Sequence, residues 1–244
     1  MIMNQADICD YSDYDYHADF WKNQNREYEH QIEHITIQTL LRAHGSNKTS
    51  IMDAGCGFGR LFNSYQPLFN QYILVDYAQH LLDEAKESIN SNNTVTFIKD
   101  SLYELTLDKK VDAIISIRTL HHLHKIENLF QKFHQNLNKN GILILDIPNY
   151  YHLKNRLKHP IQRKQKKVMQ SKNFYNYDTN YVIKMLKKAG FEIIDRRSVG
   201  LFRLNIIKKH VSAERLVKLE CMLNRLIKHF PITPSIYVLA KKCG

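Results

Sequence analysis

Short apolar runs alternate with helix-forming segments through the first 150 residues of the chain. Each run predicts a strand, and together the runs occupy residues 50–54, 72–76, 95–100, 111–117 and 141–147. The intervening segments predict helices over 26–43, 78–90 and 125–138, and a further helix that begins near Arg60. Strands that are apolar throughout are typical of a parallel sheet covered on both faces. Because crossovers between parallel strands are right-handed, the pattern predicts a doubly wound α/β fold.

The pattern changes after Pro148. Residues 149–177 contain eight Lys/Arg, no Asp or Glu and several aromatic residues, and we interpret them as an inserted basic cap. A helix over 179–189 and the strand FEIIDRRSV follow. Residues 206–230 predict one long amphipathic helix, because apolar residues recur there at three- and four-residue steps. The strand SIYVLAKK comes last, so a helical insertion separates the final two strands.

The net charge of +11 combines two unlike halves. Residues 1–150 hold 13 Lys/Arg against 19 Asp/Glu, a net charge of −6, whereas residues 151–244 hold 22 against 5, a net charge of +17. This asymmetry is compatible with an anionic partner for the basic half and equally with a well-solvated lysine-rich surface.

Composition argues against several classes of protein. No apolar run approaches the roughly 20 residues of a membrane-spanning helix, and the acidic, polar N-terminus does not resemble a signal peptide. The four cysteines are scattered without a C-x-x-C pair, so we expect a cytoplasmic protein. His121, His122 and His124 cluster without a cysteine or an H-E-x-x-H pattern, so we expect no metal.

The segment IMDAGCGFGR, residues 51–60, places three alternating glycines where a strand turns into a helix. Glycines allow a tight turn and a close approach of the backbone to a ligand. Asp53 stands at the carboxyl end of the strand, where open α/β sheets bind ligands. The dinucleotide fingerprint G-x-G-x-x-G requires glycine at position 60, where the chain has Arg60. A carboxylate beside the loop also favours a cationic ligand over a pyrophosphate.

This segment resembles motif I of the class I S-adenosylmethionine-dependent methyltransferases, acidic-x-Gly-x-Gly-x-Gly. The Leu-His-His-Leu run at 120–123 is similar to the run after the fourth strand in the small-molecule, UbiE-like branch. The resemblance covers roughly residues 45–150. It implies a Rossmann-like, mostly parallel seven-stranded sheet, with S-adenosylmethionine as methyl donor and S-adenosylhomocysteine as product.

We expect a single methyltransferase domain with four parts. Residues 1–45 would form a helical and aromatic lid, 46–148 the cofactor-binding core, 149–178 the basic cap, and 179–244 the last strands with their inserted helix.

The resemblance also implies roles for residues at the strand ends. Asp76 would accept hydrogen bonds from the ribose hydroxyls, Tyr77 would lie against the adenine, and Asp100 would reach the adenine amino group. Helix capping is an alternative role for both aspartates. The predicted cofactor-binding residues are Asp53, Gly55, Cys56, Gly57, Arg60, Asp76, Tyr77, Asp100, Ser101, Leu102, Ile117 and Arg118.

The acceptor side is less defined. His121 or His122 would deprotonate a substrate hydroxyl, although packing or capping fits each of them equally. Aromatic residues in the lid and after the cap are candidates for substrate contact, by cation–π attraction or simply as packing residues. They are Tyr16, Trp21, Tyr175 and Tyr177.

The leading hypothesis is methyl transfer by in-line displacement to a small-molecule or lipid-like acceptor, anionic acceptors included. The first alternative is an RNA methyltransferase that uses residues 149–177, although the Pro-Pro-Tyr/Phe run of amino methyltransferases is missing. The second is a cofactor-binding scaffold without turnover. Contact with an anionic membrane and the oligomeric state are left open.

Overall fold

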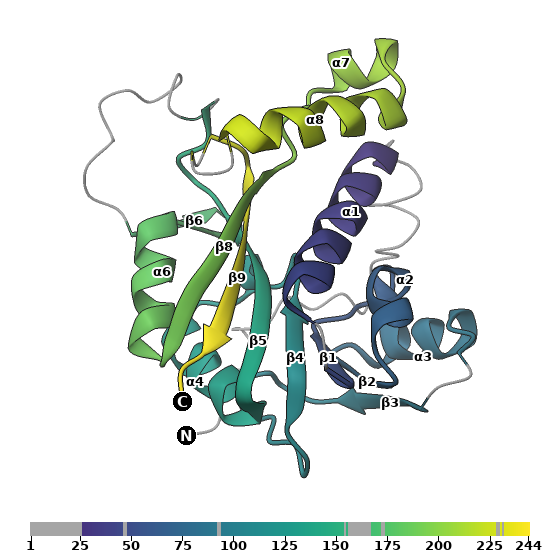
Figure 1. Ribbon diagram of the computed structural model, residues 1–244, viewed down its shortest axis with the longest axis vertical. Coiled ribbons are helices and arrows are strands. Elements are labelled where there is room, and N and C mark those ends of the chain that lie inside the picture. Colours follow the sequence, from purple (N-terminus) through teal and green to yellow (C-terminus); the bar gives the residue numbers. More distant parts are fainter. Residues whose placement is uncertain are drawn as a thin grey trace.

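The computed structural model describes residues 26–45, 48–91, 94–153, 155, 167–171, 174–227, 230 and 232–244. A seven-stranded sheet with the order β3-β2-β1-β4-β5-β9-β8 forms its centre (Figure 1). The strands of this sheet are β1 (Ser50–Ala54), β2 (Gln71–Asp76), β3 (Thr94–Lys99), β4 (Val111–Ser116), β5 (Leu137–Pro148), β8 (Phe191–Val199) and β9 (Ser235–Lys242).

Helices cover both faces of this sheet (Figure 1). One apolar core lies between the sheet and the helices α4 (Ile126–Asn136) and α6 (Thr179–Lys188). The other core lies beneath the helices α1 (Glu27–His44), α2 (Phe62–Tyr65), α3 (Gln79–Ser88) and α8 (Ala213–Ile227). The central strands are buried on both sides, which explains why their sequences are apolar throughout.

The sheet is parallel from β3 through β5, and β9 runs antiparallel between β5 and β8. This confirms the predicted doubly wound, mostly parallel seven-stranded sheet. The strand order changes direction between β1 and β4, so a crevice opens at their carboxyl ends. The glycine loop and the residues after β4 lie at this crevice.

Four predicted elements differ from the structure, and three of them differ only in length or in detail. The helix after the glycine loop is only the one turn of α2, followed by the 3-10 turn Gln66–Leu68, because Pro67 limits its continuation. Strand β5 begins at Leu137, four residues before the predicted start. The predicted cap includes an antiparallel pair, β6 (Val168–Ser171) and β7 (Phe174–Tyr177).

The single helix predicted over 206–230 is wrong. The structure has two helices, α7 (Asn205–His210) and α8, separated at Val211, whose backbone is extended with φ −129° and ψ 130°. The carbonyl of Ser212 accepts the first bond of α8, from Leu216 N at 3.2 Å. Serine favours such a helix start over a helix interior. A break of two residues leaves the apolar spacing almost unchanged, so periodicity does not reveal it.

None of the helices described here is long and apolar enough to cross a membrane.

Candidate functional site

The glycine loop forms the floor of the crevice. Gly55 and Gly57 have positive φ angles of 81° and 54°, which favour glycine. A Cβ on Gly55 would lie 2.3 Å from Thr119 Oγ1, so the loop requires glycine there to pack against the residues after β4. A Cβ on Gly57 would meet no atom within 4 Å. Gly57 therefore presents bare backbone to the crevice, where a ligand can approach closely.

Two aspartates, Asp76 and Asp100, lie at the ends of the neighbouring strands β2 and β3. Asp76 accepts a hydrogen bond from Gly57 N at 2.7 Å on one oxygen and from Ala78 N at 3.0 Å on the other. Burial raises the pKa of Asp76, although these backbone bonds oppose the shift. Asp100 N donates to the Asp76 carbonyl at 3.2 Å, and Asp100 Oδ1 accepts from Ser101 N at 2.7 Å. Each carboxylate keeps lone pairs for a ligand that donates hydrogen bonds.

Asp53 is more deeply buried than Asp76 and Asp100, the other two predicted acidic residues. Its side chain accepts a hydrogen bond from the Tyr65 hydroxyl at 2.8 Å, and burial raises its pKa to about 7. Cys56 is also buried, and burial beside Asp53 and Asp76 raises the pKa of its thiol. A thiol that stays protonated is a poor nucleophile. The pocket at this point is lined by Asp53, Gly55, Cys56, Gly57, Phe58, Arg60, Leu61, Ile117 and Arg118.

Glu33 of α1 brings three arginines together at the rim of this pocket. Its carboxylate accepts from Arg60 Nη2 at 2.7 Å and from both Nε and Nη2 of Arg118, at 2.9 and 2.5 Å. Arg203 Nη2 lies 3.8 Å from Glu33 Oε1. Burial alone would raise the pKa of Glu33, but the arginines lower it to about 2. The carboxylate is therefore a permanent anion at the centre of a cationic cluster.

Arg118 follows β4 in a conformation that arginine rarely adopts, with φ 58°. Its backbone N donates to Asp146 Oδ1 at 2.7 Å, while its guanidinium is held by Glu33. Burial raises the pKa of Asp146 to about 6, against the opposing charge of Arg118. Two separate anions thus stabilise a left-handed residue at the point where the crevice opens, which is typical of functional sites.

The two candidate bases lie together after β4, in the 3-10 turn Leu120–His122. The rings of His121 and His122 are 3.9 Å apart between centroids, and Phe174 of β7 packs 5.4 and 5.3 Å from them. Burial lowers the pKa of His122 to about 4. It also lowers the pKa of His121, which His122, Arg118 and Arg203 lower further. Both imidazoles are therefore neutral near pH 7 and weakly basic.

The aromatic residues predicted to contact substrate or cofactor do not form one cluster in the described part of the structure. The Tyr177 side chain is fully buried, and its hydroxyl donates to the Leu123 carbonyl, so it packs β7 against the turn. Tyr175 is half-buried with its ring 5.9 Å from that of His124. Tyr16 and Trp21 lie outside the described residues. Tyr77 is 43% exposed beside Asp76, open to a ligand.

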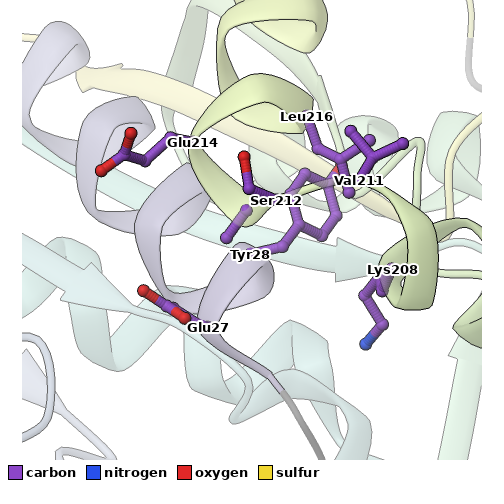
Figure 2. A pocket seen from close by; sticks show the side chains of 8 residues that line it. Glu27, Tyr28, Lys208, Val211, Ser212, Glu214 and Leu216 are labelled. Atoms are coloured by element: carbon purple, nitrogen blue, oxygen red, sulfur yellow. The ribbon is translucent and has the colours of Figure 1, made fainter.

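A second cavity, of about 280 Å³, lies between the first turn of α1 and the start of α8 (Figure 2). Tyr28, Lys208 and Leu216 form part of its wall. The Tyr28 hydroxyl donates to Glu220 of α8 and accepts from Phe202 N at 3.0 Å. These bonds fix the loop after β8, which carries Arg203 toward Glu33.

Sequence reasoning missed Glu33, Asp146 and Arg203. A signal for Glu33 was present, because it falls on the apolar stripe of α1 one residue after Ile32 and is 1% exposed. A carboxylate on a buried face requires a cationic partner. Asp146 lies inside the apolar run of β5, which gives the same kind of signal. Among the described residues, no three His, Cys, Asp or Glu side chains are arranged to hold a metal ion.

A family model, several curated relatives and a solved structure that match this chain all represent methyltransferases. The model of a methyltransferase domain matches residues 22–196. The chain is 26% identical to the ubiquinone biosynthesis O-methyltransferase of Rickettsia prowazekii over 137 residues, 53% of this chain and 54% of that protein. It is 28% identical over 113 residues to the malonyl-[acyl-carrier protein] O-methyltransferase of Bacillus cereus, 45% of this chain and 42% of that protein. The chain thus spans about half the length of these two curated relatives.

One relative matches over a longer stretch. The tRNA 5-carboxymethoxyuridine methyltransferase of Escherichia coli K12 is 24% identical over 225 residues, 84% of this chain and 85% of that protein. Among solved structures, the magnesium protoporphyrin IX methyltransferase of Synechocystis PCC 6803 with bound SAH has the same fold. The TM-score is 0.62 at 17% identity, covering 91% of this chain and 87% of that chain.

Replacing Glu33 tests the arginine cluster. Glu33→Gln leaves buried guanidinium groups without their anion, so we expect the free energy of unfolding near pH 7 to fall by about 3 kcal/mol. The pKa of Glu33 is lowered from 4.5 to about 2, so its stabilisation is present above pH 4.5 and is lost as the pH falls toward 2. Urea unfolding at several pH values measures both effects.

The matched control is Glu27→Gln, a change at an exposed position of the same helix, which should alter stability by less than about 0.5 kcal/mol. Equal stability of the Glu33→Gln variant and the wild type, or an unchanged slope with pH between 4.5 and 2, would contradict a structural role for the cluster.

Proposed function

The chain belongs to the S-adenosylmethionine-dependent methyltransferases, and we propose that it transfers a methyl group to an anionic oxygen, of the carboxylate type, on a small-molecule or lipid-like acceptor. The donor would bind along the carboxyl ends of β1, β2 and β3. The acceptor would bind beside the turn after β4.

The donor part of this proposal rests on the glycine loop and on the two aspartates at the ends of β2 and β3. Gly57 offers open backbone, and Asp76 and Asp100 keep acceptor lone pairs for a ribose diol and an adenine amino group. The Asp76 carboxylate would provide negative charge near the sulfonium, whereas burial raises the pKa of Asp53 to about 7, so that Asp53 is only partly ionised near pH 7. The Synechocystis methyltransferase, which has the same fold, holds bound SAH, and this agrees with the proposed ligand.

The acceptor part rests on one observation: both candidate bases are buried, neutral and weak, and the charges of Arg118 and Arg203 act on His121. A hydroxyl acceptor needs a base whose pKa lies near the working pH, and burial keeps the pKa of His122 at about 4. A carboxylate is already ionised near pH 7 and needs no base. It needs orientation and a cation, and Arg118 and Arg203 are close enough to His121 to lower its pKa.

Arg203 is the residue best suited to orient such an acceptor. Its Nη2 lies 3.2 Å from Ser235 Oγ and 3.8 Å from Glu33, and its Nε has no hydrogen-bond partner among the described residues. A cationic amine acceptor would be repelled by the same group. The names of two relatives, which refer to a malonyl group and to carboxymethoxyuridine, describe acceptors that contain a carboxyl group.

RNA is the second candidate acceptor, and two observations favour it. The tRNA methyltransferase matches across most of both chains, and residues 151–244 carry a net charge of +17. An RNA acceptor would require phosphate contacts, so activity would fall steeply with salt. A small carboxylate acceptor has few charges and would show a weaker dependence.

Asp76→Asn tests the donor site. The variant keeps the shape of the side chain but replaces an anion by a neutral amide, so we expect the Kd for S-adenosylmethionine to rise roughly tenfold or more. Isothermal calorimetry measures this Kd. The matched control, Asp83→Asn on the exposed surface of α3, should bind like the wild type. Equal affinity of the Asp76 variant and the control would contradict the assignment.

The reaction is tested by incubating the enzyme with methyl-labelled cofactor and cell extract separated into small-molecule, lipid and RNA fractions. A methyl ester of a carboxylate releases labelled methanol in mild alkali, which methylated amines and ethers do not. We expect alkali-labile label in the small-molecule or lipid fraction. Label that resists alkali would overturn the carboxylate acceptor, and label confined to RNA would favour the second candidate.

Arg203→Gln tests the proposed acceptor contact. Loss of one charge-assisted hydrogen bond should lower kcat/KM for the acceptor roughly 10- to 100-fold, with the Kd for the cofactor unchanged. Arg197→Gln, an arginine of β8 paired with Asp195, is the matched control and should keep wild-type kinetics. An equal loss in both variants, or a loss of cofactor affinity, would contradict a role in acceptor binding.

A further inference from the structure

The α7–α8 arm, residues 205–227, presents large apolar side chains to solvent. Ile206 is 70% exposed in α7, and Met222 and Leu226 are 69% and 74% exposed in α8. Leu219, at 44%, precedes Met222 and Leu226 by three and seven residues. These spacings place the three α8 residues on one face of the helix. Phe230, just beyond the helix, is 61% exposed and extends the apolar set.

The opposite face of α8 holds the helix on the protein. Leu216 and Val217 are 2% and 5% exposed in the core beneath α1. Two polar residues share this buried face, Glu220 at 0% and Asn224 at 7% exposure. Glu220 accepts from Gly200 N at 2.8 Å, from Leu201 N at 2.9 Å and from the Tyr28 hydroxyl. The outward apolar residues therefore take no part in fixing the arm.

Basic residues accompany the outward apolar face. Lys209, Arg215 and Lys218 are exposed, whereas the acidic residues of the two helices are the exposed Glu214 and the buried Glu220. Arg215 precedes Leu219 by four residues and so lies in line with the apolar row. A helix with outward aliphatic side chains and adjoining cations has the composition of an interfacial amphipathic helix.

We propose that the α7–α8 arm docks this protein on an anionic lipid surface. The aliphatic side chains would enter the boundary between headgroups and acyl chains, and Lys209, Arg215 and Lys218 would meet lipid phosphates. The arm lies at the outer end of the molecule, beyond the carboxyl edge of the sheet, where a flat surface can reach it (Figure 1). This inference does not depend on the identity of the methyl acceptor.

Other occupants fit the face less well. A symmetric dimer through this face would bring identical basic residues together, which is unfavourable. RNA would pair with the lysines and arginine, but base stacking uses aromatic side chains, and the exposed apolar residues of α8 are leucine and methionine, with one aromatic residue, Phe230, beyond the helix. An anionic lipid surface satisfies both the charge and the aliphatic character.

The arm also forms a wall of the cavity between α1 and α8 (Figure 2). Lys208 of α7 pairs with Glu29 of α1 at 2.8 Å beside this cavity, so the arm is anchored to the helix that carries Glu33. Docking through the outer face would bring the cavity close to the lipid surface.

Vesicle flotation with the full chain tests the proposal. We expect the protein to float with vesicles of phosphatidylcholine mixed with phosphatidylglycerol and to stay unbound with phosphatidylcholine alone. The double variant Met222→Glu/Leu226→Glu places charges on the outward face, so the vesicle-bound partition should fall about tenfold or more. The matched control, Ile35→Glu/Ile194→Glu, makes the same change at exposed apolar positions of α1 and β8 and should bind like the wild type.

Thermal unfolding of each variant checks that the fold is retained. The proposal is overturned by absence of binding to the anionic vesicles, or by equal flotation of the double variant and the wild type. Two further results would overturn it if the wild type does not bind vesicles. The first is a concentration-dependent dimer of the wild type in sedimentation velocity that the double variant does not form. The second is RNA binding by the wild type that the double variant has lost. Unchanged methyl transfer to a water-soluble acceptor in the double variant would separate the docking surface from the proposed reaction.

Discussion

The ion pairs around Glu33 join parts of the chain that are far apart in sequence. Arg60 belongs to the glycine loop, Arg118 follows β4, and Arg203 belongs to the loop after β8. A carboxylate buried without cations would cost several kcal/mol. Helix α1 is therefore stable over the carboxyl edge of the sheet only where these guanidinium groups converge. One anion thus fixes helix α1, the entrance of the proposed donor pocket and the proposed acceptor side in one arrangement.

The titratable groups of the crevice are of two kinds, those that stay ionised because an opposite charge is near and those whose charged form is disfavoured by burial. Glu33 stays ionised because arginines surround it, whereas burial raises the pKa values of Asp53 and Asp146 to about 7 and 6. His121 and His122 are buried near positive charge or near each other, and both lose basicity. Such a crevice is well suited to orient charged groups and poorly suited to remove a proton. That distinction, more than any single distance, supports an acceptor that is already anionic.

The parts predicted from the sequence are those that local chemistry determines. Apolar runs locate β1, β2 and β4, because strands buried in the middle of the sheet have no other composition; β3 is a half-exposed edge strand and has a more mixed sequence. Alternating glycines locate the loop, because left-handed backbone and open space require them. In the Glu33 cluster, the glutamate contacts Arg60, Arg118 and Arg203, which lie between 27 and 170 positions further along the sequence. Contacts over such separations leave no spacing pattern. The local traces are carboxylates within apolar patterns, Glu33 on the buried face of α1 and Asp146 in the apolar run of β5.

Helix α8 shows why apolar spacing alone can mislead about packing. Its leucines recur at helical steps, which favours a core-facing stripe, yet Leu219 and Leu226 are exposed and Glu220 is fully buried. The reason is a polar constraint. The backbone N–H groups of Gly200 and Leu201 and the Tyr28 hydroxyl need an acceptor inside the protein, and Glu220 provides it. Once Glu220 faces inward, helix geometry turns the row through Leu219, Met222 and Leu226 outward. The exposed apolar face is thus a consequence of a well-satisfied interior, and its aliphatic and basic character is best explained by a surface outside the protein.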